Sequence, residues 1–180
     1  MSRIYLPLIL ALLIILQGAT ANLIPASFDA AGWIVVIHGC FLFLVLIKLF
    51  YDLETTYYAL LAALFVGLII DIIYTDIIGV YMFSYALMIY FVHGMRKLLQ
   101  TNFYVATLLT MVSLGLVDAL LYFIYHFIGV TQLEMADYLT YRLMPTVAIN
   151  LILFFVLYLL FRKTLIKWSD ERFDLEKSTN

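Results

Sequence analysis

Two long apolar runs joined by a short polar turn constrain this chain more than any other feature. They lie between Leu64 and Lys97 and meet at Tyr74-Thr75-Asp76. Each run is long enough to approach a membrane span as an α-helix, in which backbone hydrogen bonds are satisfied internally. Because the connection is so short, the two helices must be antiparallel neighbours. The sequence therefore predicts a transmembrane helical hairpin.

The first helix of this hairpin carries an acid on a face that a glycine leaves open. Asp71 follows Gly67 by four residues, so both lie on one helix face. The glycine allows another backbone to approach closely, and the acid sits where that contact excludes lipid. Gly79 follows eight residues after Asp71 and opens the second helix. We expect the hairpin to pack through this face.

The composition extends the membrane prediction to the whole chain. Of the 180 residues, 66% are hydrophobic and 12% are charged, whereas about 45–50% of a soluble domain is apolar. Lipid must cover the excess, so we predict an all-α integral membrane protein. A net charge of −2 without a basic patch argues against nucleic acid as a partner. The sequence pairs no nucleophile with a base and has no metal-ligand spacing or phosphate loop, which predicts no enzymatic activity and no cofactor.

Hydropathy predicts six spans with short loops. A membrane domain over 1–162 holds spans at about 4–22, 32–50, 57–74, 78–95, 103–128 and 142–162, and a short tail follows over 163–180. The chain has ten Lys and Arg residues. Only Arg142 falls on one side of the predicted membrane, which leaves nine on the other. By the positive-inside rule both termini are cytoplasmic.

Polar residues from five spans are predicted to share one layer in the outer half of the bilayer. At about 1.5 Å per helical residue, this layer holds Gln17, His38, Asp71, Asp118 and Asn150, with Arg142 just above it. We favour a clasp in which these groups satisfy one another and hold the helices together. A small outward-facing cavity for a ligand or for a partner's polar group is the functional alternative. Ion conduction fits less well, because the inner half is almost purely apolar.

In order along the chain, these residues resemble the MreD family of bacterial rod shape-determining proteins. The resemblance rests on Gln17 ending span one, Gly67, Asp71 and Gly79 in the central hairpin, Asp118 in span five, and Arg142-Leu143-Met144-Pro145-Thr146 followed by Asn150 in span six. The last group is similar to the version found in Gram-positive bacteria. Span count and loop size agree over nearly the whole chain.

The resemblance implies a non-enzymatic, multi-pass component of the cell-elongation complex in the bacterial cell membrane. Its direct partner would be MreC, in a complex with MreB, RodA and a class B penicillin-binding protein. The alternative is the substrate-binding component of an energy-coupling vitamin transporter, which is also a six-helix protein. The short loops argue against gating a ligand.

The first span also has the pattern of a signal peptide. Arg3 precedes an apolar run from Ile4 to Leu16, and Ala19-Thr20-Ala21 fits a cleavage site. Cleavage would leave five spans with an outside N-terminus. Because the family resemblance includes this span, we expect residues 1–21 to be retained.

Overall fold

The computed structural model describes residues 2–20, 32–99 and 102–178, and every regular element within them is helical. These elements are α1 (Ser2–Thr20), α3 (Gly39–Leu46), the π-helix η1 (Ile47–Tyr51), α4 (Tyr58–Tyr74), α5 (Val80–Leu98), α6 (Phe103–Phe127), α7 (Met135–Asp137), the π-helix η2 (Tyr138–Leu143) and α8 (Met144–Ser178). Residues 21 and 22 of the predicted first span lie outside the described residues. The all-helical prediction is confirmed for the described part.

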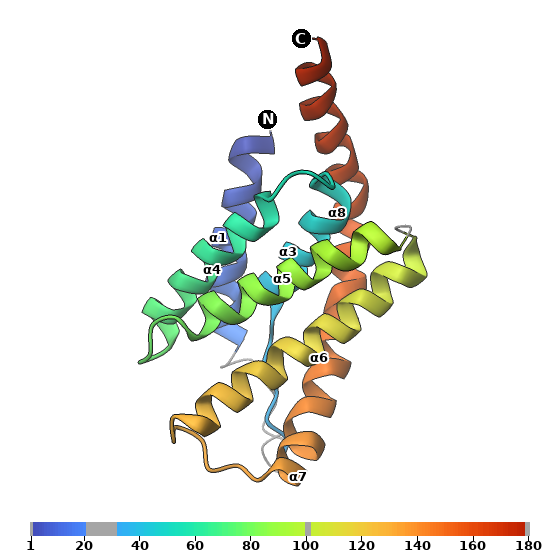
Figure 1. Cartoon of the computed structure of the whole chain (residues 1–180). Coiled ribbons are helices and arrows are strands. Elements are labelled where there is room, and N and C mark those ends of the chain that lie inside the picture. The colour runs from blue at the N-terminus through green and yellow to red at the C-terminus, as the bar shows by residue number, and fades with distance from the viewer. Residues whose placement is uncertain (1, 21–31, 100–101, 179–180) are drawn as a thin grey trace.

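Both termini lie at the same end of the molecule (Figure 1), together with the connection between η1 and α4. The turn between α4 and α5 and the short helix α7 lie toward the other end. This arrangement agrees with an even number of crossings. The cytoplasmic location of the termini remains a prediction from the charge bias.

The central hairpin has the predicted form. α4 ends at Tyr74 and α5 begins at Val80, so residues 75–79 form a turn slightly longer than predicted. The two helices run antiparallel and side by side (Figure 1). Gly79 precedes the first residue of α5 with a φ of 107°, a left-handed conformation that glycine adopts without steric cost.

The predicted helix over 32–50 is wrong in its first third. Residues 33–37 form an extended, non-helical segment (Figure 1), His38 has φ −105° and ψ 42°, and the helix begins only at Gly39. Five extended residues cover about 16 Å, and the 13 residues from Gly39 to Tyr51 cover roughly another 20 Å. An extended half and a helical half can therefore cross a core of about 30 Å together, although the helix alone is too short.

Two helices are long and apolar enough to cross a membrane by themselves, and they cover Phe103–Phe127 and Met135–Arg172. Shorter apolar helices cover Ile4–Ala19, Gly39–Tyr51 and Tyr58–Tyr74. The six-span topology therefore remains a prediction. α8 has 35 residues, or about 52 Å of helix, and the predicted short tail after residue 162 continues this helix as far as Ser178.

α3 lies at the centre of the molecule. All eight of its residues are buried, as expected for a helix that is apolar on every side. Leu6, Leu10 and Ile14 of α1 belong to the same buried cluster. Large apolar side chains instead cover the outer surface; Phe65 of α4 and Ile152 of α8 are 67% and 65% exposed. Such a surface suits lipid rather than water.

Candidate functional site

The extended segment before α3 is held by side chains of α8. The Val36 N–H donates to Thr146 Oγ1 at 3.1 Å. Asn150 Nδ2 donates to the Val36 carbonyl at 2.6 Å, and Asn150 Oδ1 accepts from the His38 N–H at 2.7 Å. One side-chain amide thus makes the donor and acceptor bonds that a neighbouring strand would supply. Non-helical backbone is tolerated at membrane depth only where such bonds are made inside the protein.

Pro145 completes the attachment of this segment. It lies in the first turn of α8 and has no N–H, so the Tyr141 carbonyl four residues earlier loses its usual helical donor. The Ile34 N–H donates to that carbonyl at 2.7 Å. The wider π-helical turn η2 comes directly before, where an inserted bond partner is commonly accommodated. The same extended segment before α3 is therefore held through Pro145, Thr146 and Asn150.

Asp118 forms the centre of a second group, which links three elements. The carboxylate is fully buried. It accepts from the Tyr138 hydroxyl at 3.0 Å and from Arg142 Nη2 at 3.3 Å, and His38 Nε2 lies 3.4 Å from Oδ1. The other ring nitrogen of His38 lies 3.2 Å from the Tyr85 hydroxyl. We call Asp118, His38, Tyr138 and Arg142 the outer clasp, because it joins α6 to η2 and to the start of α3.

Asp71 serves the hairpin instead. Its oxygens accept backbone N–H bonds from Gly79 at 2.9 Å, Tyr81 at 2.9 Å and Met82 at 3.1 Å. These groups form the N-terminus of α5, where a carboxylate is favoured by the helix dipole. On the same face of α4, a Cβ added to Gly67 would lie 2.5 Å from the Met82 Cα. The two backbones therefore touch where Gly67 lacks a side chain.

The residues of the predicted polar layer thus belong to separate groups of contacts in the structure. Asp118 contacts both His38 and Arg142 directly. Gln17 Oε1 accepts from the Cys40 N–H at 3.3 Å and joins α1 to the first turn of α3. We expected the polar groups of this layer to satisfy one another; the hydrogen bonds of Asn150 among the described residues go instead to backbone atoms of Val36, His38 and Thr146.

A polar cluster at the end that carries both termini was missed by sequence reasoning. Lys48 is 1% exposed, and its Nζ donates to Asp52 Oδ2 at 3.0 Å and to the Leu53 and Thr56 carbonyls at 3.2 and 2.8 Å. Asp52 also accepts from the N–H groups at the start of α4. The four-residue spacing of Lys48 and Asp52, and an acid shortly before a helix, are signals that predict such a cluster.

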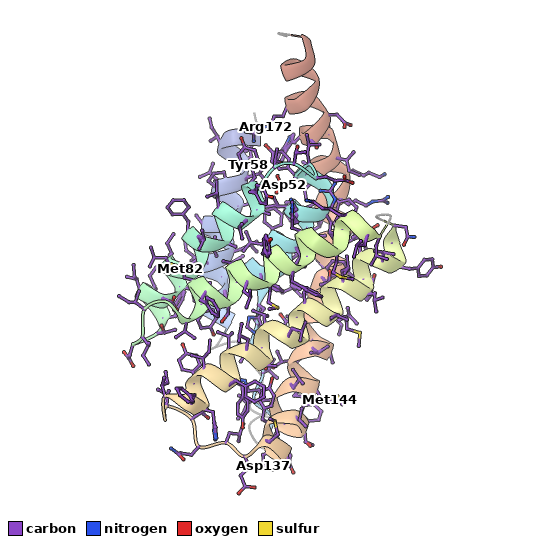
Figure 2. The ribbon with its side chains drawn as sticks, in the orientation of Figure 1. Asp52, Tyr58, Met82, Asp137, Met144 and Arg172 are labelled. Atoms are coloured by element: carbon purple, nitrogen blue, oxygen red, sulfur yellow. The ribbon has the colours of Figure 1, made fainter. Side chains whose placement is uncertain are left out.

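The end of α8 is attached to this cluster. Figure 2 shows Asp52, Tyr58 and Arg172 together at this end of the molecule. The Arg172 guanidinium bonds the hydroxyls of Tyr51 and Tyr58, and Ser169 Oγ donates to the Tyr51 carbonyl at 2.8 Å. The helical extension of α8 is therefore fixed to the start of α4.

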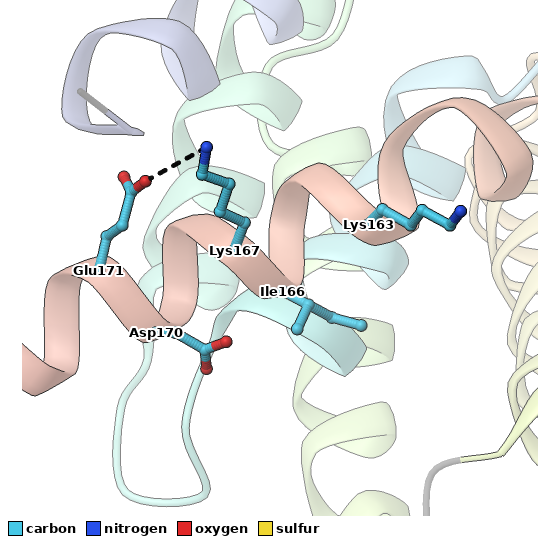
Figure 3. Close-up of a pocket in the computed structure, with 5 residues that line it drawn as sticks. All are labelled: Lys163, Ile166, Lys167, Asp170 and Glu171. Carbon is cyan, nitrogen blue, oxygen red and sulfur yellow. Dashed lines mark ion pairs between the residues drawn. The ribbon is translucent and has the colours of Figure 1, made fainter.

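One shallow hollow lies on the outer face of this extension (Figure 3). Its lining residues all belong to α8 and are Lys163, Ile166, Lys167, Asp170 and Glu171. Lys167 and Glu171 form an ion pair at 3.8 Å with side chains 74% and 49% exposed. A single helix face with exposed side chains encloses no ligand. Among the described residues no three His, Cys, Asp or Glu side chains are grouped to hold a metal ion.

Comparisons with known proteins agree with the resemblance. A family model described as rod shape-determining protein MreD matches residues 2–168. A curated protein from Bacillus subtilis (strain 168), rod shape-determining protein MreD, is 24% identical over 168 residues, which cover 90% of this chain and 92% of the relative. No solved structure matches the chain. The family match runs from α1 into the last third of α8, so the outer clasp and the hairpin lie within it.

Proposed function

Because the chain belongs to the MreD family and therefore has a role in determining rod shape, we propose that it is a non-enzymatic scaffold of the bacterial cell-elongation complex. In this proposal it binds MreC directly in the cell membrane. Through MreC it links MreB filaments to RodA and to a class B penicillin-binding protein. The family match over residues 2–168 is the observation that carries the proposal.

The arrangement of polar groups supports a scaffold. Asp118 joins α6 to η2 and α3, Asp71 fixes the hairpin, and Arg172 fixes the end of α8 to α4. In each of these contacts the polar atoms bond a neighbouring helix or the backbone at its end. The helices are thereby held together, which supports a rigid helical surface for a partner. The comparisons do not support the alternative of a vitamin-transporter component.

Depletion of the chain in the bacterium that encodes it tests the proposal. We expect cells to widen and lose their rod shape, and MreC to copurify with the tagged chain from native membranes. Re-expression of the wild-type chain is the control. Depleted cells that keep normal width, with wall synthesis still placed along the side wall, would refute the assignment.

A further inference from the structure

His93 near the end of α5 is a buried polar side chain without a hydrogen-bond partner in the described part of the chain. The residue is 5% exposed, and neither ring nitrogen has a hydrogen-bond partner among the described residues. The Tyr57 ring lies 4.7 Å from the imidazole and the Tyr90 ring lies 6.3 Å from it, measured between centroids. Leaving a buried donor unpaired costs free energy, so an unpaired imidazole in a native fold calls for an explanation.

The charges around this ring favour an anion. Lys48, Lys97 and Arg96 act electrostatically on His93, and Asp52 opposes them. Lys48 and Arg96 already bond acceptors around Asp52. Lys97 is exposed in the last turn of α5. The surroundings of the ring are therefore net positive, with one cation directed outward.

An apolar stripe on α5 leads to this position. Exposed residues recur along one face of the helix at Phe83, Leu87, Tyr90, Gly94 and Lys97, with the spacing of four and three residues that marks a single helix face. Nothing lies within 4 Å of a Cβ added at Gly94, so the exposed face of α5 is open at the turn that also carries His93. The stripe has aromatic and aliphatic side chains at its Phe83 end and the ammonium group of Lys97 at its other end.

We propose that Tyr57, Tyr90, His93, Gly94 and Lys97 form a binding site for the phosphate of an anionic phospholipid, which we call the α5 lipid site. The phosphate oxygens accept hydrogen bonds from His93 and Lys97, and an acyl chain follows the stripe toward Phe83. Tyr57 and Tyr90 are 46% and 58% exposed, and in this proposal rotation of one of these rings opens the buried imidazole to the headgroup.

A lipid fits this site better than a partner protein because the positive end and the apolar stripe succeed each other along one helix face. That order matches the order of headgroup and acyl chain in a phospholipid. By the charge bias the site lies at the cytoplasmic leaflet, where anionic lipids attract basic residues with about 1 kcal/mol each. The inference does not rest on the proposed function, since it involves no other protein.

The test compares the purified full chain in nanodiscs of phosphatidylcholine alone, of phosphatidylcholine with phosphatidylglycerol, and of phosphatidylcholine with free inorganic phosphate. The thermal unfolding midpoint and the lipids retained in native mass spectrometry are measured. His93→Phe keeps a ring between the two tyrosines and removes both nitrogens. Lys97→Gln removes the free cation, and Gly94→Leu fills the open space without changing charge. Lys163→Gln removes an exposed cation of α8 at the same end and is the matched control.

We expect phosphatidylglycerol to raise the midpoint of the wild type and of Lys163→Gln. We expect each site variant to bind it about fivefold more weakly, the factor that corresponds to roughly 1 kcal/mol. Equal retention in Lys97→Gln and Lys163→Gln would overturn the proposal, even if His93→Phe fails to fold. Free phosphate that raises the unfolding midpoint as much as phosphatidylglycerol does would overturn the assignment to an anionic lipid. So would a midpoint in phosphatidylcholine alone that equals the midpoint with phosphatidylglycerol.

Discussion

Buried polar side chains in this protein act mainly on the main chain. Asn150 pairs with the backbone of the extended segment, Asp71 with the start of α5, and Asp52 with the start of α4. Each occupies a place where helical bonding is interrupted or begins. In an apolar surrounding an unpaired backbone group costs several kcal/mol, so one polar side chain at each interruption is essential to the fold.

Removing the Asn150 amide should destabilise the whole molecule. Asn150→Ala leaves the Val36 carbonyl and the His38 N–H without their partner. With each buried group costing about 1–3 kcal/mol, we expect a loss of about 2–6 kcal/mol in reversible unfolding by SDS in mixed micelles. Ile152→Ala, on the exposed face of the same helix, is the control and should cost about 0.5 kcal/mol. Equal losses would contradict the assigned role.

The stability of the protein should fall more when Asp71 loses both its acceptor oxygens and its charge than when it loses the charge alone. Asp71→Leu leaves three N–H groups at the start of α5 unpaired, which predicts a loss of roughly 3–9 kcal/mol. Asp71→Asn keeps one acceptor oxygen but turns an NH₂ group toward the same donors, so about half that loss is expected. Asp76→Asn in the exposed turn is the control. An Asp71→Leu protein with wild-type stability in the same SDS titration would refute the capping role.

At the scale of elements, the contact between α4 and α5 depends on the missing side chain at Gly67. A Cβ there meets the Met82 backbone at 2.5 Å, and backbone cannot rotate away as a side chain can. We expect Gly67→Ala to cost about 2 kcal/mol or more through overpacking. Gly115→Ala on α6 has open space around it and should stabilise its helix by up to about 1 kcal/mol. Unfolding midpoints of the two variants provide the comparison; equal midpoints would exclude close packing at Gly67.

The hairpin was predictable because its signals are local: two apolar runs, a short turn and Gly67 four residues before Asp71. The extended half of the second span was not. Residues 33–38 are as apolar as the helix after them, so hydropathy treats the whole stretch as one span. Their bonding partners, Thr146 and Asn150, lie more than 100 residues away in the sequence. Pro145 just before these two polar residues was the sequence signal, but its effect on the Tyr141 carbonyl requires the fold.

The same distinction holds for the outer clasp. Helix rise predicts that Asp118 and Arg142 lie at similar depth, since the position of each along its own helix is a local property. The same estimate for His38 assumed a helix over 32–38, which the structure replaces by an extended segment. Which of them meet depends on how the helices rotate about their axes, and tertiary packing decides that. Asp71 shares the predicted depth, yet its oxygens serve the hairpin.

At the scale of the whole molecule, α1 is part of the bundle. Leu6, Leu10 and Ile14 are at most 9% exposed, and the Tyr74 hydroxyl donates to the Ile14 carbonyl at 2.9 Å. Near the other end, Tyr5 stacks on Trp168 with centroids 5.7 Å apart. Removal of α1 would uncover this face of the core.

We therefore expect the protein isolated from membranes to retain its first helix. Intact-mass measurement should give a chain that includes residues 4–21. The cleavage motif ends at Ala21, which lies outside the described residues. A mature N-terminus at Asn22 would contradict the retention of α1 and would leave Tyr74 without its acceptor.

The topology can be tested over the same whole molecule by labelling. Cys40 is fully buried, so Cys40→Ala should give a silent background for single introduced cysteines. Asp76 lies in the turn between α4 and α5 and Gln132 just before α7, two exposed positions in connections at the end opposite the termini (Figure 1). Thr55 is exposed in the connection between η1 and α4, which lies at the same end as the termini. If nine of ten basic residues mark the cytoplasmic side, a membrane-impermeant maleimide added to intact cells should label Gln132→Cys and Asp76→Cys. Thr55→Cys should react only after the membrane is permeabilised, which is also the control that this site is reactive. Labelling of Thr55→Cys in intact cells would show that the orientation is opposite to the predicted one. Labelling of only one of the two outer sites would refute six spans.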